Sequence, residues 1–186
     1  MNWGGSTSNA NGGFSLLFNF DPTVNFSFAV RTGPNDHMGF TLTEPTAWKS
    51  GFQPAPQSYD RPIAVLIGPG CFSAGDNNAS RIRFHPTARL FGKPTNGARV
   101  APGSVSGSLP DSWKYSFYTQ VAYSKRPDEG YLIHKGVQPD EVVWLTREDA
   151  AKGDDTVVKR AIAWIRKTTS VQLGQQEPRS HALLQN

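Results

Sequence analysis

A continuous apolar run near the centre of this 186-residue chain ends abruptly in a glycine-rich turn. The run extends from Pro62 to Gly68 and is rich in β-branched residues, which is typical of a strand buried on both faces of a parallel sheet. It stops at Gly68-Pro69-Gly70, and a helical pattern follows over residues 73–84. This order predicts an α/β fold with the turn at the carboxyl edge of the sheet, where sites on such sheets usually lie.

Alternating apolar and polar residues predict further strands. They cover residues 24–30 and residues 113–124, the second as one arm of a hairpin, and an apolar segment predicts a short strand over 88–91. Residues 1–13 and 31–61 are dominated by Gly, Ser, Asn and Pro. We expect a loop in the first and a long surface excursion with short strands in the second.

The clearest helical pattern covers residues 154–167. Asp154 or Asp155 is expected to cap it, and its apolar residues form one stripe while its basic residues face water. The last residues are polar and without periodicity. We therefore expect a single core over residues 1–167 and a polar flexible tail over residues 168–186.

Composition argues against several kinds of partner. The net charge is +4, only 18% of the residues are charged, and the basic ones are scattered, so no nucleic-acid surface is predicted. No apolar run is long enough for a membrane span, and the first residues lack the pattern of a signal peptide. The single cysteine, Cys71, and the dispersed histidines predict no metal site. The glycine-rich loops lack the P-loop pattern, so no cofactor is implied.

Ser73 is the leading candidate for chemistry. It lies between small residues at the strand-to-helix junction, where its hydroxyl would stand beside free helix amides, as in a serine nucleophile with half an oxyanion hole. The alternative is that Ser73 caps the helix through its side chain, and spacing alone favours this alternative. Asp76 also has two interpretations. It stabilises the first helical turn, which we favour, or it orients the serine turn.

Five sequence blocks in a fixed order resemble one known family. The blocks are RPIAVLIGPGCFSAGD, ARLFGKPTNGA, WKYSFYTQVAYSK, GVQPDEVVWLT and REDAAKGDDTVVKRAIAWI. Together they look like the catalytic core of the C-terminal processing peptidases, a family that includes the tricorn core and interphotoreceptor retinoid-binding protein. The resemblance covers residues 60–166 and, more weakly, the start of the chain.

The resemblance implies a crotonase-like core of stacked strand–helix units and a serine peptidase that acts on peptides or proteins. In that family pattern Ser73 attacks the scissile carbonyl, and the amide of Ala74 is one oxyanion donor. The second donor would be a glycine amide, here Gly4 or Gly5 in the Asn-x-Gly-Gly segment, with the glycines at 12 and 13 as a poorer choice.

The chain departs from the family pattern at the general base. Ala98 occupies the position of the family lysine, and Lys93 lies five residues earlier. The glutamate of the tricorn-like branch corresponds to Ile133, with Glu129 out of register. His134 follows that position directly, and we single it out as the residue that would serve as a local base for Ser73.

Three hypotheses follow. The chain begins within the Asn-x-Gly-Gly segment, which suggests a C-terminal part of a longer peptidase. The first hypothesis is that this part is a serine peptidase core, active with upstream sequence or as a homo-oligomer that supplies a base in trans. The second hypothesis is a non-catalytic module that binds a peptide or an apolar ligand. The third is a product that is not stably folded alone and associates through an exposed sheet edge.

The remaining reactive side chains have simpler interpretations. His85 precedes a proline at a helix end, where a structural role is expected. Cys71 is expected to be a small buried residue beside the turn. His37 reads as exposed in a polar loop, and His181 lies in the polar tail. None of these four residues is predicted to take part in catalysis.

Overall fold

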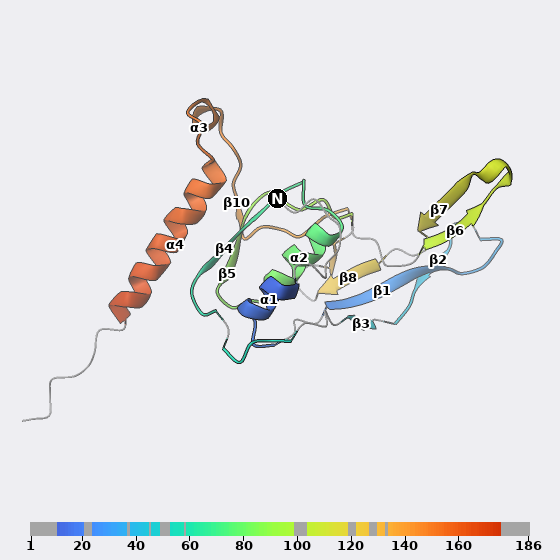
Figure 1. Ribbon diagram of the computed structural model, residues 1–186, viewed down its shortest axis with the longest axis horizontal. Coiled ribbons are helices and arrows are strands. Elements are labelled where there is room, and N and C mark those ends of the chain that lie inside the picture. The colour runs from blue at the N-terminus through green and yellow to red at the C-terminus, as the bar shows by residue number, and fades with distance from the viewer. Residues whose placement is uncertain are drawn as a thin grey trace, which may run out of the picture.

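The computed structural model describes most of the chain (Figure 1). The described residues are 11–20, 24–36, 38–44, 46–48, 53–57, 59–98, 104–118, 122–126, 130–132 and 134–175.

A three-stranded parallel sheet lies at the centre of the molecule. Its strands are β4 (Ile63–Ile67), β5 (Ala88–Gly92) and β10 (Glu141–Val142), in the order β10-β5-β4. Both pairings are parallel, and helix α2 (Ala74–Ile82) connects β4 to β5. The predicted α/β class with a parallel sheet is thus confirmed, as are the strands expected at 62–68 and 88–91.

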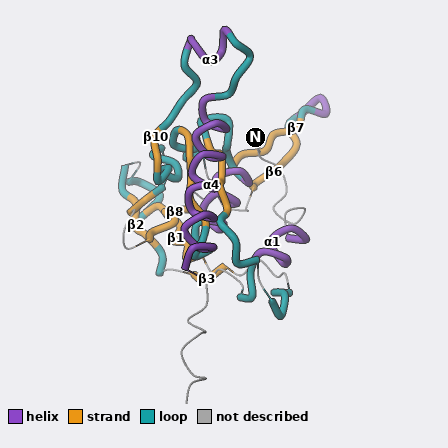
Figure 2. The backbone as a smooth tube through the Cα atoms, turned by 90° about the vertical axis from the view of Figure 1, so that its left-hand side faces the viewer, coloured by secondary structure: helices purple, strands orange, loops and turns teal. Residues whose placement is uncertain are grey.

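Helices cover both faces of this sheet. Figure 1 shows α4 (Thr156–Gln175) on one side and α1 (Asn11–Leu17) with α2 on the other, and in Figure 2 α4 lies in front of the strands. The expectation that the β4 run is buried on both faces is wrong at Leu66, which is 43% exposed. Because side chains alternate along a strand, Leu66 shares the α4 side with Ala64, and α4 covers only part of that side.

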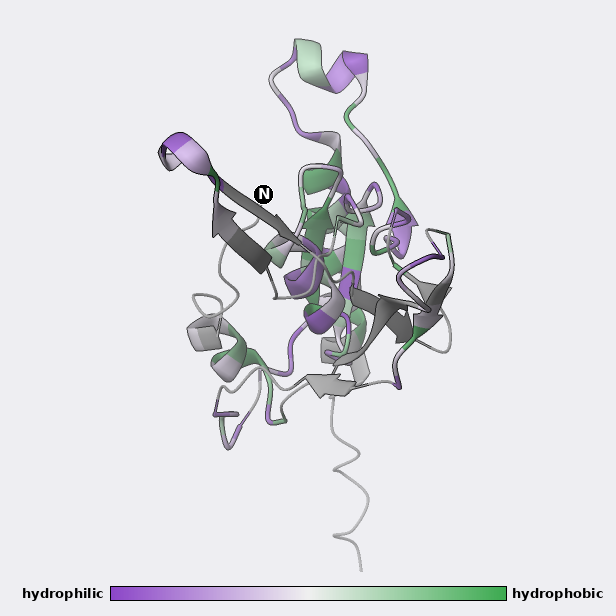
Figure 3. Cartoon of the chain, turned by 90° about the vertical axis from the view of Figure 1, so that its right-hand side faces the viewer, coloured by the Kyte–Doolittle hydropathy of each residue, from purple (hydrophilic) through white to green (hydrophobic). Residues whose placement is uncertain are grey.

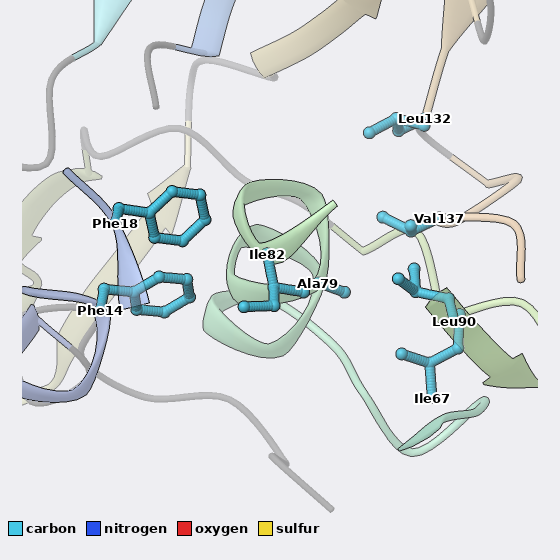
Figure 4. Close-up of a cluster of buried hydrophobic side chains, with 8 residues drawn as sticks. All are labelled: Phe14, Phe18, Ile67, Ala79, Ile82, Leu90, Leu132 and Val137. Atoms are coloured by element: carbon cyan, nitrogen blue, oxygen red, sulfur yellow. The ribbon is translucent and has the colours of Figure 1, made fainter. Parts of the chain in front are cut away.

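The larger hydrophobic cluster fills the space between α1, α2 and the sheet (Figure 4). Figure 4 shows Phe14 of α1 and Phe18, directly after it, on one side of α2, and the side chains of Ile67, Leu90, Leu132 and Val137 on the other. Its buried members are Phe14, Phe18, Ile67, Ala79, Ile82, Leu90, Leu132 and Val137. The cluster therefore fixes α2, and the turn that precedes it, against the ends of β4 and β5.

A smaller cluster lies between the sheet and α4. Phe91, Val157 and Ala161 are its buried members, and the rings of Phe91 and Trp164 lie 5.6 Å apart. Hydrophobic residues accordingly concentrate along the central strands in Figure 3.

A second, antiparallel sheet is built around β1 (Val24–Arg31), which confirms the strand predicted at 24–30. Strand β1 pairs with three others, β2 (Phe40–Leu42), β3 (Thr46–Trp48) and β8 (Ala122–Arg126). The short strand β9 (Gly130–Tyr131) extends the sheet beyond β8. The surface excursion at 31–61 thus carries short strands, as expected.

The strand predicted over 113–124 is confirmed as one arm of a hairpin, but its extent is wrong. The structure has two strands there, β7 (Lys114–Tyr118) and β8, and they belong to different sheets. Strand β7 pairs with β6 (Ser104–Ser108), a strand that the sequence analysis did not predict. The two strands are joined through a short 3-10 segment, η2 (Pro110–Ser112), and form a hairpin that projects from the rest of the molecule (Figure 1). The alternation of apolar and polar residues is the same in β7 and β8, so it could not show that the two strands have different pairing partners.

Helix α4 is longer than predicted. It continues past Lys167 to Gln175, and Asp155 caps its start by accepting hydrogen bonds from the amides of Val157 (2.8 Å) and Val158 (3.1 Å). A short helix that the sequence did not predict, α3 (Arg147–Ala151), precedes it. The first three residues of helix α1 also lie in the segment 1–13, which was expected to be loop. No helix in the described ranges combines the length and apolarity that a membrane span requires.

Candidate active site

The three parallel strands end at one edge of the sheet. The amide of Lys93, directly after β5, donates to the Ile67 carbonyl at the end of β4 (3.3 Å). The amide of Val143, directly after β10, donates to the Gly92 carbonyl at the end of β5 (3.0 Å). The glycine-rich turn after β4 therefore shares this edge with the segments that follow β5 and β10, as the sequence predicts.

Ser73 is the last residue of that turn and has a strained backbone. Its φ is 54° and its ψ is −110°, although it is not a glycine. Such a conformation is sparsely populated by residues with a Cβ and costs on the order of 1–3 kcal/mol. A serine held this way at a sharp strand-to-helix turn is the arrangement by which α/β-hydrolases expose a nucleophilic hydroxyl.

Ser73 is the N-cap residue of α2 by position, but the expectation that its side chain caps the helix is wrong. Helix α2 begins at Ala74, and the Ser73 side chain makes no capping hydrogen bond. An N-cap side chain reaches the helix amides from the extended region of backbone conformation, and Ser73 does not adopt that region. Capping therefore does not explain why a serine occupies this strained position.

Backbone hydrogen bonds hold the serine turn in place. The amide of Cys71 donates to the Gly68 carbonyl, and the amide of Asn96 donates to the Cys71 carbonyl, both at 2.8 Å. The amide of Gly75 donates to the Phe72 carbonyl, also at 2.8 Å. The turn is thus fixed both within itself and to the loop after β5.

Asp76 makes the next connection between these segments. Its carboxylate is 2% exposed, and its Oδ1 accepts a hydrogen bond from the Gly97 amide at 2.9 Å. Asp76 lies in the first turn of α2, so it has the position we favoured for it. It also ties the serine turn to the 95–97 loop, which spacing alone does not indicate.

The backbone of His134 contacts the same loop. Its φ is 61°, its side chain is exposed, and its amide donates to the Gly97 carbonyl at 3.1 Å. The structure therefore brings the backbones of the two candidate segments to one loop, through Asp76 and Gly97. In the described part of the chain, no hydrogen bond joins the His134 ring to Ser73.

The candidate oxyanion donors are only partly described. Ala74 is the first residue of α2, so its amide has no acceptor within its own helix. Gly4 and Gly5 lie outside the described residues. Gly12 and Gly13, the second choice, lie in α1.

The basic side chains near the edge differ from the family pattern. Ala98 directly follows Gly97 and is exposed, so the loop carries a methyl group where the family pattern has a lysine. The ammonium of Lys93 lies 4.8 Å from the ring centroid of Trp144. Ile133 and Glu129 lie outside the described residues.

His85 and Cys71 have structural surroundings. His85 is buried, and its Nε2 lies 3.0 Å from the Leu17 carbonyl, which can only accept, so this contact joins α1 to the end of α2. Cys71 is buried beside the turn, as predicted. His37 and His181 lie outside the described residues, and among those described no three histidine, cysteine or acidic side chains gather as metal ligands would.

The sequence does not reveal that the 95–97 loop and the 132–137 segment interlock. Gly97 has φ +73° and Gly136 has φ +68°, and a Cβ on Gly97 would lie 2.6 Å from the Gly136 nitrogen. The Thr95 hydroxyl oxygen accepts from the Val137 amide at 2.7 Å. Glycines at turn positions were the available signal, but the sequence does not show which two turns meet.

Solved structures resemble this fold over most of its length. A peptidase from Parabacteroides merdae superposes with a TM-score of 0.64 at 24% identity, over 88% of this chain and 49% of its own. A lipoprotein from Streptococcus agalactiae gives 0.55 at 16% identity, over 89% and 51%. Mature CPAF complexed with lactacystin gives 0.56 at 15% identity, over 92% and 42%.

This chain therefore spans about half the length of the solved structures that it matches. No curated protein matches this chain in sequence. A sequence model of peptidase family S41, in contrast, matches residues 1–143, which is more than half of the chain. The S41 peptidases are the family that the five sequence blocks resemble, and this chain belongs to it.

Proposed function

We propose that this chain carries the nucleophile of a serine-type endopeptidase and that Ser73 is that nucleophile. The observation that carries the proposal is the backbone of Ser73, strained at φ 54° and ψ −110° between a parallel strand and a helix. Strain of this kind persists only where the surroundings impose it, and it concentrates at functional sites. Membership of family S41 supports the same assignment.

The proposed reaction proceeds through an acyl-enzyme. Ser73 Oγ attacks the scissile carbonyl carbon and loses its proton to the His134 imidazole, and the carbonyl oxygen becomes an oxyanion. The Ala74 amide donates to that oxyanion, with a second donor from Gly4 or Gly5. When the C–N bond breaks, the amine takes the proton from His134. Water then hydrolyses the ester and regenerates Ser73.

The role of His134 rests on its location. Its amide is bonded to Gly97, and Gly97 is bonded to Asp76, three residues after the nucleophile. Its side chain is exposed and is therefore not packed into the hydrophobic core. A catalytic hydrogen bond is often absent without substrate and forms only in the complex, so the ring need not contact Ser73 in this state.

We extend the proposal to the architecture and the partners. The core is of the crotonase-like type, and the substrates are peptides or proteins. Because the chain spans about half of the structures it matches, activity is proposed for the whole protein, with a homo-oligomer that supplies a base in trans as the second arrangement.

A second candidate function is a non-catalytic module that binds a peptide or an apolar ligand. Ala98 favours it, because the resemblance places a lysine base at this position and alanine cannot accept a proton. The two functions differ in one property, which is the reactivity of the Ser73 hydroxyl.

The test is labelling by a fluorophosphonate, which reacts with activated serine hydroxyls. We expect the native chain to be labelled, Ser73→Ala to be unlabelled, and His134→Ala to be labelled on the order of 100-fold more slowly. Ser112 is the matched control, because it is an exposed serine with a positive φ of 66° on the β6–β7 hairpin. Ser112→Ala should be labelled like the native chain.

The outcomes separate the two functions. Loss of labelling in Ser73→Ala alone supports the assignment of Ser73 as the nucleophile and shows that a group other than His134 is the base. Equal labelling of native chain and Ser73→Ala contradicts the proposal. No labelling of a chain whose circular dichroism shows it to be folded means that its residues do not suffice for catalysis, and the binding module is favoured where the whole protein also stays unlabelled.

A further inference from the structure

Asp76 carries a carboxylate that the proposed reaction does not use. The side chain is 2% exposed, and only Oδ1 has a partner, the Gly97 amide at 2.9 Å. The other oxygen, Oδ2, is buried and accepts no hydrogen bond within the structure as described. Burying a carboxylate with incomplete hydrogen bonding is costly, so its presence three residues after Ser73 requires a reason.

Stabilisation of the first turn of α2 is not a sufficient reason. An acidic side chain interacts with a helix N-terminus just as well from the surface, where it keeps its hydration. The buried position instead brings Oδ1 to a backbone amide 21 residues further along the chain. The position therefore serves the contact with Gly97 rather than the helix.

Gly97, which donates to Asp76, also contacts the His134 segment. The Gly97 carbonyl accepts from the His134 amide at 3.1 Å, and its Cα approaches that segment so closely that a Cβ would lie 2.8 Å from the Leu132 carbonyl oxygen. Thr95, two residues before, is bonded to Val137 through both its amide (3.1 Å) and its hydroxyl (2.7 Å). The 95–97 loop and the 132–137 segment thus form one unit, and Asp76 joins that unit to the serine turn.

We propose that Asp76 is a positioning residue: its Oδ1, by accepting the Gly97 amide, sets the location of the His134 turn relative to Ser73. This role rests on the proposed function of those two residues. It depends on the position of an acceptor oxygen and not on negative charge. An asparagine at 76 can present the same oxygen, whereas a glutamate presents it one methylene further away.

The test compares Asp76→Asn, which keeps the acceptor and removes the charge, with Asp76→Glu, which keeps the charge and moves the acceptor. Asp140→Asn is the matched control, because Asp140 Oδ2 accepts the Leu90 amide at 2.7 Å on β5. The first readout is hydrogen exchange at the amides of Gly97 and His134, measured beside that of Ala161 in α4. The second readout is the rate of fluorophosphonate labelling.

We expect Asp76→Asn and Asp140→Asn to keep native exchange at Gly97 and His134, and native labelling. Asp76→Glu should speed exchange at both amides while Ala161 stays protected. It should slow labelling on the order of 100-fold, as a displacement of about 1 Å does in other active sites.

Two results would overturn the proposal. One is native exchange and labelling in Asp76→Glu, and the other is an Asp76→Asn variant as impaired as Asp76→Glu, which would assign the role to charge. The exchange readout requires no activity. A whole protein that stays unlabelled therefore refutes the proposed function, while the exchange at Gly97 and His134 still decides whether Asp76 positions that turn.

Discussion

Ser73 combines two properties that rarely occur together, a positive φ and a side chain. Its ψ of −110° places it outside the helical and extended regions. The turn is bonded to the loop after β5 by the Asn96 amide at 2.8 Å, so relaxing Ser73 would break contacts beyond the turn itself. The strain is therefore imposed by tertiary structure, which explains why spacing alone favoured a helix cap.

Replacing Ser73 by glycine should make the protein more stable than replacing it by alanine. Glycine adopts a positive φ without strain, although it is more flexible in the unfolded chain, and the net difference is expected to be about 1 kcal/mol in the free energy of unfolding. Urea unfolding of Ser73→Gly and Ser73→Ala measures it.

Ser80 is the matched control for this comparison, because it is a serine within helix α2. There the order should reverse, with Ser80→Gly less stable than Ser80→Ala by about 1 kcal/mol. Equal stabilities of Ser73→Gly and Ser73→Ala would show that the backbone at 73 is not strained.

At the scale of elements, the corner between α3 and α4 is held by charged and hydroxyl groups. Asp149 accepts hydrogen bonds from Lys159 Nζ at 2.8 Å and from the Thr156 hydroxyl at 2.6 Å. These bonds, with Lys159 first, lower the pKa of Asp149, and the bond to Asp149 raises the pKa of Lys159. The corner is thus most stable when both groups are ionised.

Acid should loosen this corner before the core unfolds. A lowered pKa in the folded state means that the contribution of Asp149 is complete above the ordinary pKa of an aspartate, about 4, and is lost as pH falls below it. Hydrogen exchange at the α3 amides should therefore speed up relative to β5 as pH is lowered through this range, after correction for intrinsic rates. Lys159→Met should show the fast exchange already at neutral pH, and unchanged exchange in that variant would refute the role of the pair.

Elements were predictable from the sequence where a local pattern carried the information. The β4 run, the capped α4 helix and the Gly68-Pro69-Gly70 turn are each specified by neighbouring residues. The pairing of β6 with β7 and of β8 with β1 depends on contacts between distant segments, which alternation does not encode. The same holds for the site. Residue types and order indicated Ser73, but the Asp76–Gly97 bond could be found only in three dimensions.

At the scale of the whole molecule, the central sheet joins two hydrophobic clusters that lie on its opposite faces. Leu90 and Phe91 are adjacent in β5, fully buried, and belong to different clusters. The cluster that contains Leu90 supports α2 and the serine turn, and the cluster that contains Phe91 holds α4. Loss of either cluster should therefore weaken the support of the candidate site.

Phe91→Ala should lower the free energy of unfolding by about 3–5 kcal/mol, because it removes a buried ring and leaves a cavity against Trp164. Val142→Ala on β10 is the control, since Val142 is 75% exposed and its truncation should cost less than about 0.5 kcal/mol. Chemical denaturation measures both variants. Similar losses in the two would contradict the assignment of Phe91 to the core.

The central claim is that Ser73 is chemically reactive, and tandem mass spectrometry of the fluorophosphonate-treated native chain tests it most directly. We expect a phosphonyl adduct on Ser73 and none on Ser112, an exposed serine that also has a positive φ. The absence of an adduct from Ser73 would contradict the claim, and an adduct on both serines would show that reactivity does not require the strand-to-helix turn.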